Sequence, residues 1–173
     1  MRDELETPRL RLRRWRPEDL DTLVRWHADP VLMQHMGQAS FTREETEVML
    51  AHVERHWQAH GFGLWAAEEK QTEALIGRVG LSYHREWPDD PEVGWLIDAP
   101  WQGRGLATEA GAACIAACIG YAFDDLGFER VVSITTAENA ASRRVIAKLG
   151  FSPWQEVRDS VFGLRLIVHA LDR

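Results

Sequence analysis

The sequence is poor in cysteine and in long hydrophobic runs. It has two cysteines, and Cys114 and Cys118 fall four positions apart in a run that is typical of a helix, where their side chains point in parallel directions. A disulfide between them is therefore not expected, and the pair indicates a reducing compartment. The longest uncharged run, residues 110–123, is too short to cross a membrane. The charged first residues do not resemble a secretory signal, so we expect a cytoplasmic protein with no membrane partner.

A surplus of positive charge is also missing. The chain has 27 acidic residues against 20 basic ones and a formal net charge of −7. A nucleic-acid partner that binds through a basic surface is therefore not expected. The one arginine-rich segment alternates with leucine in residues 9–13, which predicts a strand with one solvated face. Linkers, low-complexity tracts and repeats are not evident, and the length fits a single domain over residues 1–173.

The hydrophobic pattern predicts alternating strands and helices. Pro17 and Pro30 stand where two short helices begin, and a capping box of Thr42 and Glu45 starts a longer helix that Gly61 can end. The polar residues 89–91 predict a loop. Strands are predicted at residues 9–15, 62–68, 75–83, 92–98 and 130–135, with a final hairpin over 156–171 and further helices after residue 105 and over 140–149. This order predicts an α/β (α+β) fold with a mixed central sheet and helices on both faces.

The segment 101–110 is the most informative part of the chain. Gly103, Gly105 and Ala107 remove side-chain bulk where a strand leads into a long helix. Backbone N–H groups and the positive end of the helix dipole can bind an anion there, and a pyrophosphate is the natural guest. A dinucleotide loop would need a third small residue where Thr108 stands, and the Gly-Lys-Ser/Thr of nucleoside-triphosphate loops is absent.

Three motifs together resemble one known family, the GNAT N-acetyltransferases. Gln102, Gly105 and Ala107 satisfy its coenzyme A loop pattern, Q/R-x-x-G-x-G/A. Residues 139–151 match its next motif, in which N-x-x-S/A is followed by K-x-G-F. The N-terminal residues that resemble the RimJ/RimL branch are 6–13, 17–20, 29–30 and 36–37, so the likeness covers nearly the whole chain. It implies a mostly antiparallel central sheet with one splayed parallel strand pair.

The resemblance implies acetyl-coenzyme A as co-substrate and no metal. The cofactor would lie between the strands at residues 92–98 and 130–135. Backbone groups of one strand would bind pantetheine, the loop amides would bind the pyrophosphate, and the Asn139 side chain would bond a pantetheine amide. The cofactor-binding residues implied in this way are Trp95, Leu96, Ile97, Gln102, Gly103, Arg104, Gly105, Leu106, Ala107, Thr108, Asn139 and Ser142.

Two residues are predicted to be catalytic. Glu92 opens the splayed strand in a setting similar to that of RimL-like members, which favours it as the base that takes a proton from the amine. The alternative is an ordinary exposed glutamate at a strand end. Ser142 resembles the serine that serves the leaving thiolate in that branch; its alternative role is a hydrogen bond to the preceding turn. The tyrosine that many relatives use as an acid is replaced here by Ile146, and Ile134 stands where several carry a base.

The leading hypothesis is an N-acetyltransferase that moves acetyl from acetyl-coenzyme A to a primary amine by direct attack in a ternary complex. The acceptor could be a protein N-terminus or a small-molecule amine. Two alternatives remain open: a non-catalytic module that binds or senses acyl-coenzyme A, and transfer of a longer acyl group. The family also allows a homodimer.

Several other residues carry an open choice between a site and ordinary packing. His52, His56 and His60 share one helix stripe, but their spacing from Glu54 does not fit the zinc-protease motif, and a solvated face is expected. Tyr83 could contact an acceptor or pack in the core. The same choice applies to His84, Trp26, Trp57 and Trp87.

Overall fold

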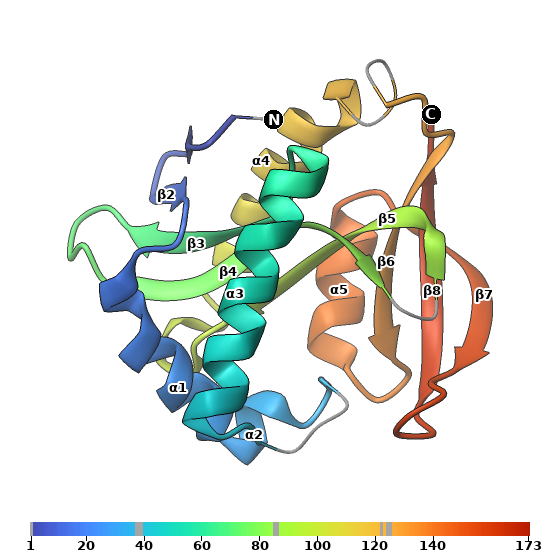
Figure 1. Cartoon of the computed structure of the whole chain (residues 1–173). Helices are drawn as coiled ribbons and strands as arrows, with labels where there is room; N and C mark the ends of the chain where they lie inside the picture. Colours follow the sequence, from blue (N-terminus) through green and yellow to red (C-terminus); the bar gives the residue numbers. More distant parts are fainter. Residues whose placement is uncertain (1, 37–39, 85–86, 122, 124–125) are drawn as a thin grey trace.

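The computed structural model describes residues 2–36, 40–84, 87–121, 123 and 126–173, which form one eight-stranded sheet with the order β1-β2-β3-β4-β5-β6-β8-β7 (Figure 1). The parallel pair is β5–β6, and the other neighbours are antiparallel. The mostly antiparallel sheet predicted from the sequence is therefore confirmed. Its strands are β1 (Leu5–Glu6), β2 (Leu10–Arg13), β3 (Leu64–Glu69), β4 (Leu75–His84), β5 (Trp87–Ile97), β6 (Arg130–Thr136), β7 (Ser152–Arg158) and β8 (Arg165–Asp172).

Helices cover both faces of the sheet, as expected. The long helix α3 crosses the face turned towards the viewer in Figure 1, and α4 lies behind the sheet. α4 packs against β2, β4 and β5, with α5 beside it. The α-helices are α1 (Leu20–Ala28), α2 (Pro30–Met33), α3 (Arg43–His60), α4 (Leu106–Gly120) and α5 (Ala140–Lys148), and 3-10 turns occur at Pro17–Asp19 and Ala99–Trp101.

The predicted helix ends are confirmed. The Thr42 hydroxyl accepts the Glu45 N–H at 3.2 Å, and the Glu45 carboxylate accepts the Thr42 N–H at 2.8 Å, which is the reciprocal capping box. Gly61 ends α3 with φ of 72°. Asp29 caps α2 by accepting the Val31 N–H at 2.9 Å. Gly37, which closes the N-terminal motif, lies outside the described residues.

The prediction of a loop at residues 89–91 was wrong. These residues belong to β5, where Pro91 pairs with Tyr83 of β4. β5 and β6 first meet at the pair Glu92–Val132, so this end of β5 is paired along one edge only. Proline has no N–H to donate, and an edge is where a strand tolerates it.

A buried stripe fixes α4 against the sheet. Leu106, Ala110, Cys114 and Cys118 recur at four-residue spacing and are at most 3% exposed. Both cysteines are free, as expected, with their sulfur atoms 3.6 Å apart. Small side chains let the helix approach the strands closely, which in turn fixes the position of the loop that precedes it.

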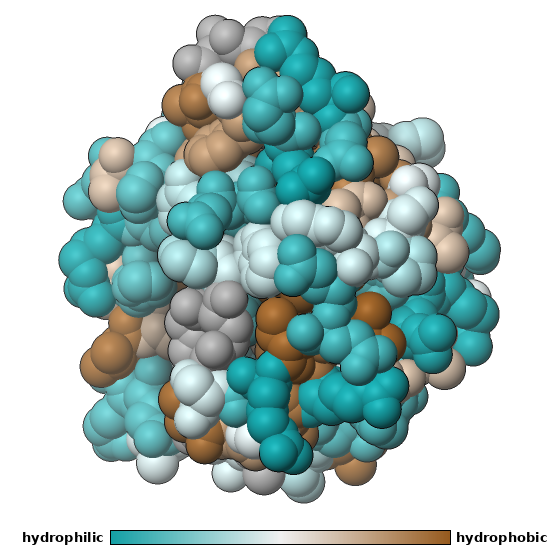
Figure 2. Space-filling view, turned by 90° about the vertical axis from the view of Figure 1, so that its right-hand side faces the viewer, coloured by the Kyte–Doolittle hydropathy of each residue, from teal (hydrophilic) through white to brown (hydrophobic). Residues whose placement is uncertain are grey.

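The surface that faces the viewer in Figure 2 is mostly hydrophilic, and its hydrophobic residues form scattered patches. The larger exposed hydrophobic side chains include Trp154, Val161 and Phe162 of the β7–β8 hairpin. No helix in the described part of the chain has both the length and the apolar character needed to span a membrane. The homodimer stays a prediction.

Candidate active site

The parallel strands β5 and β6 separate almost as soon as they meet. Glu92 pairs with Val132, and no further β5–β6 pair occurs among the described residues. Beyond this point β5 follows β4, while β6 pairs along its whole length with β8. One side-chain hydrogen bond holds the junction, in which the Ser133 hydroxyl donates to the Val93 carbonyl at 2.9 Å. The Ile134 N–H also lies near enough to the Glu92 carboxylate to act on its pKa. The strands therefore open a wedge whose narrow end is Glu92.

A cavity of about 620 Å³ occupies the wide part of the wedge. Its walls come from the end of β5, the segment 101–108, one side of α5 and the region of α2. It contains every cofactor-binding residue predicted from the sequence except Arg104. Those residues are Trp95, Leu96, Ile97, Gln102, Gly103, Gly105, Leu106, Ala107, Thr108, Asn139 and Ser142.

The loop before α4 has the properties of an anion site. Gly103 and Gly105 have φ of 74° and 78°, a left-handed conformation that side chains disfavour. Gly105 is the N-cap of α4 and provides no side-chain acceptor, so the first N–H groups of the helix have no cap. The Gln102 side chain donates to the Ile97 carbonyl at 2.9 Å and closes the loop onto β5. Gln102 therefore braces the loop through its side chain, while its predicted contact with the cofactor stays a prediction.

The N-terminal segment holds this loop in place. Arg9 donates through Nη1 to the Arg104 carbonyl at 2.9 Å and through Nε to the Glu109 carboxylate at 2.7 Å. Thr7 donates to the same carboxylate at 2.6 Å. Burial alone would raise the pKa of Glu109, but the hydrogen bonds from Thr7 and Arg9 lower it overall. The ionised Glu109 thus ties the first turn of α4 to the segment between β1 and β2.

A second cavity of about 110 Å³ adjoins the first. Both cavities are lined by His35, Met36, Trp95, Asn139 and Ser142, so the cleft and the smaller cavity share a wall. The smaller cavity also contains the predicted base, Glu92.

Glu92 is half-buried rather than exposed. Burial raises its pKa, and the opposing effects of His84, the Ile134 N–H and Arg78 do not cancel that rise. A carboxylate with a raised pKa is a stronger base than an exposed one, which is the property that proton removal from an amine requires. The position and environment of Glu92 therefore suit a general base.

Asn139 and Ser142 stand at the boundary between the cavities. The Asn139 side-chain oxygen accepts the Ser142 N–H at 3.0 Å and caps α5, which leaves the amide NH₂ as its available donor. The Ser142 hydroxyl makes no hydrogen bond with a described residue, so the alternative bond to the preceding turn is not seen. Ile146, one turn further, is fully buried in the core.

Sequence reasoning gave no definite role to several other residues that line the cavities: it left Arg144 open between the phosphates of coenzyme A and water, and it did not consider the others. Arg144 and Lys148 line the larger one from α5, and their i, i+4 spacing could have shown that they share a helix face. His35 hydrogen-bonds with Thr136 of β6 at 3.0 Å. Arg78 lines the smaller cavity; the available signal was an arginine within an otherwise apolar strand.

Of the aromatic and histidine candidates, His84 is near enough to Glu92 to act on its pKa, while the others lie elsewhere. Tyr83 packs against His56, His60, Phe62 and Phe128. His56 is half-buried and hydrogen-bonds with the Phe62 carbonyl at 2.9 Å, so a wholly solvated histidine face was wrong. The described residues contain no cluster that could hold a metal ion. Trp26 and Trp57 are buried in the core, and Trp87 packs against Trp154.

Comparisons with known proteins agree with this geometry. Residues 9–152 match the sequence profile of the acetyltransferase (GNAT) domain. The chain is 29% identical over 157 residues to the uncharacterised protein YkkB of Bacillus subtilis, covering 90% of this chain and 88% of that protein. It is 26% identical over 149 residues to the uncharacterised N-acetyltransferase YoaA of the same organism, covering 85% and 81%.

Solved structures share the fold. An acetyltransferase from Agrobacterium tumefaciens superimposes with a TM-score of 0.83 at 24% identity, over 100% of this chain and 96% of that one. The ribosomal-protein acetyltransferase RimL in complex with coenzyme A has a TM-score of 0.77 at 16% identity, over 96% and 95%.

The open sheet and the cleft at its parallel junction are those of an acyltransferase. The chain belongs to the GNAT acetyltransferase family, whose members use acetyl-coenzyme A. The assignment made from the three sequence motifs is therefore confirmed.

Proposed function

We propose that this protein transfers acetyl from acetyl-coenzyme A to a primary amine, by direct attack while both substrates are bound. One observation carries the proposal. Glu92 lies at the single β5–β6 pair, in a small cavity that shares Asn139 and Ser142 with the larger cleft. A base for the amine and a site for the cofactor are thus adjacent. The N-terminus of a protein and a small-molecule amine are the candidate acceptors, and a cytoplasmic homodimer is the expected form.

The larger cleft fits the cofactor. Its volume of about 620 Å³ lies within the range of small-molecule sites. A Cβ built on Gly103 would meet nothing within 4 Å, so a phosphate can approach the backbone there. The amides of residues 103–108 would bind the pyrophosphate, Arg144 and Lys148 would attract phosphates, and backbone groups of residues 95–97 would bind pantetheine as an added strand does. The bound cofactor supplies an activated acetyl thioester.

The residues of the chain then provide the proton transfers. Glu92 accepts a proton from the ammonium form of the acceptor, which frees the nitrogen lone pair for attack. A β5 backbone N–H polarises the carbonyl, a C–N bond forms and the C–S bond breaks. As the amide forms, the attacking nitrogen releases its second proton to water. Ser142 donates a proton towards the departing sulfur and is reprotonated from water, while Glu92 releases its proton to water.

Ile146 replaces the tyrosine that many relatives use as an acid, and it is buried in the core. The absence of that acid leaves a weaker alternative, a module that binds acyl-coenzyme A without turnover. Release of free thiol from acetyl-coenzyme A in the presence of a panel of amines tests the difference. Thiol release that depends on the amine supports the enzyme, whereas cofactor binding without turnover by any amine supports the binding module. Succinyl-coenzyme A in the same assay tests for a longer acyl group.

Coenzyme A is expected to stabilise the fold. A ligand at 100 times its dissociation constant adds about 2.7 kcal/mol, which for a chain of this length raises Tm by roughly 5–10 °C. Adenosine nucleotides that lack pantetheine should raise Tm less, because the strand-like contacts are missing. Differential scanning fluorimetry measures both. An unchanged Tm at saturating coenzyme A would contradict the cofactor cleft.

Ser142→Ala is expected to slow turnover less than a change at Glu92. Water can protonate a thiolate, which is already a tolerable leaving group, so we expect a loss of about tenfold or less in kcat, below the usual range for a general acid. The Ser142 N–H that Asn139 caps is retained in this variant, and α5 should keep its start. Steady-state kinetics with acetyl-coenzyme A check this. A loss as large as that of Glu92→Gln would assign the essential proton donor to Ser142.

A further inference from the structure

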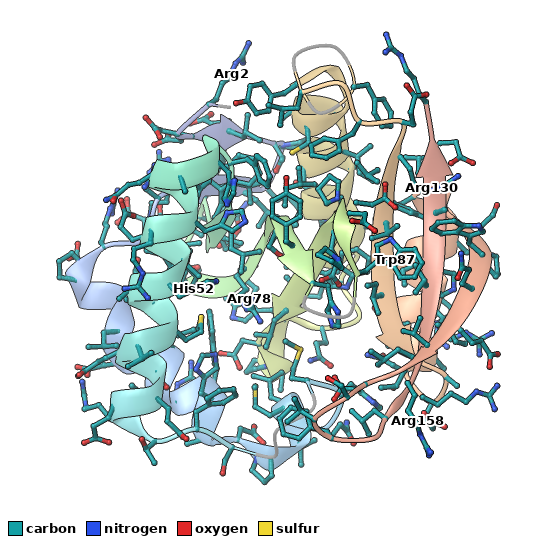
Figure 3. All side chains as sticks on the ribbon, turned by 45° about the vertical axis from the view of Figure 1, so that its right-hand side comes forward. Arg2, His52, Arg78, Trp87, Arg130 and Arg158 are labelled. Carbon is teal, nitrogen blue, oxygen red and sulfur yellow. The ribbon has the colours of Figure 1, made fainter. Side chains whose placement is uncertain are left out.

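Arg78 is a charged group that the proposed mechanism does not use. It lies in β4 and lines the smaller cavity. In Figure 3 it occupies the middle of the molecule, between α3 and β5. Its Nε is buried without a hydrogen-bond partner, and no ion pair joins the guanidinium to a described residue. Arg78 is half-buried, and its Nε therefore lacks the hydrogen-bond acceptor that a buried polar group of a charged side chain normally has.

The sheet register places Arg78 at one end of the cavity floor and Glu92 at the other. Arg78 pairs with Leu96, Gly80 with Gly94, and Ser82 with Glu92. Paired residues and residues two apart share a face of the sheet, so these three pairs stand in a row. The first and third pairs are about 13 Å apart along the strands.

The middle pair of this row has no side chains. A Cβ on Gly94 would come no closer than 3.8 Å to another group, the Glu92 carboxylate, so the floor is open on the β5 side. On the β4 side it is closed, because a Cβ on Gly80 would meet the Gly63 carbonyl oxygen at 2.2 Å. Arg78 and Glu92 are near enough to interact electrostatically, yet they form no ion pair. The gap between the guanidinium and the carboxylate is therefore free for a small molecule.

A cation held in this way is costly to the protein alone. Burying an arginine without an acceptor loses its solvation, and such a charge is compensated only when a partner supplies hydrogen bonds. Glu92 is the one carboxylate among the described residues that line the smaller cavity, and the junction with β6 already uses it through the Ile134 N–H. The described side chains of this cavity thus leave Nε of Arg78 without an acceptor, and a ligand in the cavity can supply one.

We propose that the acetyl acceptor is a small amino carboxylate, in which one to a few carbon atoms separate a primary amine from a carboxylate. This inference rests on the proposed function. The carboxylate would receive paired hydrogen bonds from Arg78, a geometry that guanidinium groups favour, and the amine would lie at Glu92. The cavity volume of about 110 Å³ equals roughly four waters at about 30 Å³ each, which suits a compact acceptor. A protein N-terminus has no free carboxylate near its amine and would leave Arg78 unpaired.

Matched acceptors test the proposal. Thiol release from acetyl-coenzyme A is followed with glycine, β-alanine and a set of α-amino acids, each beside its amide and its decarboxylated amine, and with short peptides that have a free N-terminus. Loss of hydrogen bonds to a charged group costs roughly 10- to 100-fold, so kcat/KM for the best amino acid should exceed that for its amide by that factor. Aminomethylphosphonate shows whether a phosphonate can replace the carboxylate.

Variants of Arg78 assign the selectivity to this residue. In Arg78→Met the ratio of kcat/KM for amino acid over amide should fall to near one, mainly through a higher KM for the amino acid. Arg78→Lys keeps the charge without the paired hydrogen bonds and should give an intermediate ratio. Arg55→Met removes the same charge from the exposed surface of α3 and should keep the wild-type ratio. The Tm rise caused by coenzyme A shows that each variant is folded.

The outcomes separate the two proposals. Faster turnover of amides, amines or peptides than of amino carboxylates would overturn the inference and leave the acetyltransferase proposal standing. No turnover with any amine would overturn both. An unchanged ratio in Arg78→Met would also overturn the inference. Because removal of an unpaired buried charge should not destabilise the fold, a large drop in the Tm of Arg78→Met would show that the protein itself pairs this residue, which contradicts the inference.

Discussion

Replacing Glu92 with glutamine is expected to lower the rate of acetyl transfer about 10²–10⁴-fold, the usual contribution of a general base. Glutamine keeps a side-chain oxygen that can accept the Ile134 N–H, so the junction between β5 and β6 should persist. Coenzyme A binding should therefore remain close to wild type, because the cofactor contacts lie further along β5 and in the loop. Steady-state kinetics and thermal shift measured on the same preparation separate the two effects.

The pH dependence of this variant gives a second test. The wild-type rate should rise with pH through the raised pKa of Glu92 and continue to rise as the free amine loses its proton. The glutamine variant should lack the Glu92 step and recover partly at high pH, where neutral amine is abundant. His84 and Arg78 act on Glu92, so the step reports the carboxyl group in its folded setting. Near-normal activity at neutral pH would make Glu92 structural.

The free energy of unfolding should fall with rising pH, whereas the rate of acetyl transfer should rise. The folded state holds the Glu92 proton more tightly than the unfolded chain, whose pKa is near the ordinary value of 4.5. Between those two pKa values the native state binds more protons, so the ionisation of Glu92 lowers the free energy of unfolding as pH rises through this window. Above the folded pKa of Glu92, the full destabilisation caused by its ionisation remains, and below pH 4.5 this destabilisation vanishes. Glu92→Gln should therefore be more stable than wild type at neutral pH, as measured by urea denaturation.

Gly105→Val is expected to abolish useful coenzyme A affinity. The loss should be about 100-fold or more if two or more hydrogen bonds from backbone amides to phosphate are disturbed. Gly105 has φ of 78°, which a β-branched residue strongly disfavours, and its amide opens the helix that would receive the pyrophosphate. The variant should keep a folded circular-dichroism spectrum, because Gly105 is exposed and lies outside the core. Isothermal titration calorimetry with coenzyme A measures the loss.

A matched control separates backbone strain from the anion site. Gly163 has φ of 67°, and a Cβ there would meet nothing within 4 Å, so Gly163→Val imposes a similar strain in the β7–β8 hairpin, away from the cleft. It should lower stability by a similar amount and leave coenzyme A affinity unchanged. Equal losses of affinity in both variants, or normal affinity in Gly105→Val, would show that the pyrophosphate does not bind at this loop.

The sequence predicted those parts of the site that depend on local signals. A glycine loop before a helix, a capping box and a helix that ends at Gly61 depend on neighbours within a few residues, and all three are present. The role of Arg78 depends on which residues of β5 stand opposite β4, and this register cannot be read from either strand alone. Likewise, a proline such as Pro91 is typical of a loop. It fits a strand only because one edge of β5 is unpaired there, which the sequence does not show. The packing of His56 against Phe62 and Tyr83 joins α3 to β4, which the sequence does not specify.

The single β5–β6 pair has a mechanical consequence. It divides the sheet into a five-stranded part, β1 to β5, and a three-stranded part of β6, β8 and β7, which are pinned together at Glu92, Val93 and Ser133. A ligand bound between the two parts contacts both and restricts their movement relative to each other. When the ligand leaves, this restriction is lost. The strand junction with a single residue pair therefore lies at the proposed catalytic site. Changes that loosen the pin should appear first as slower turnover and faster amide hydrogen exchange along β5 and β6, well before the protein unfolds.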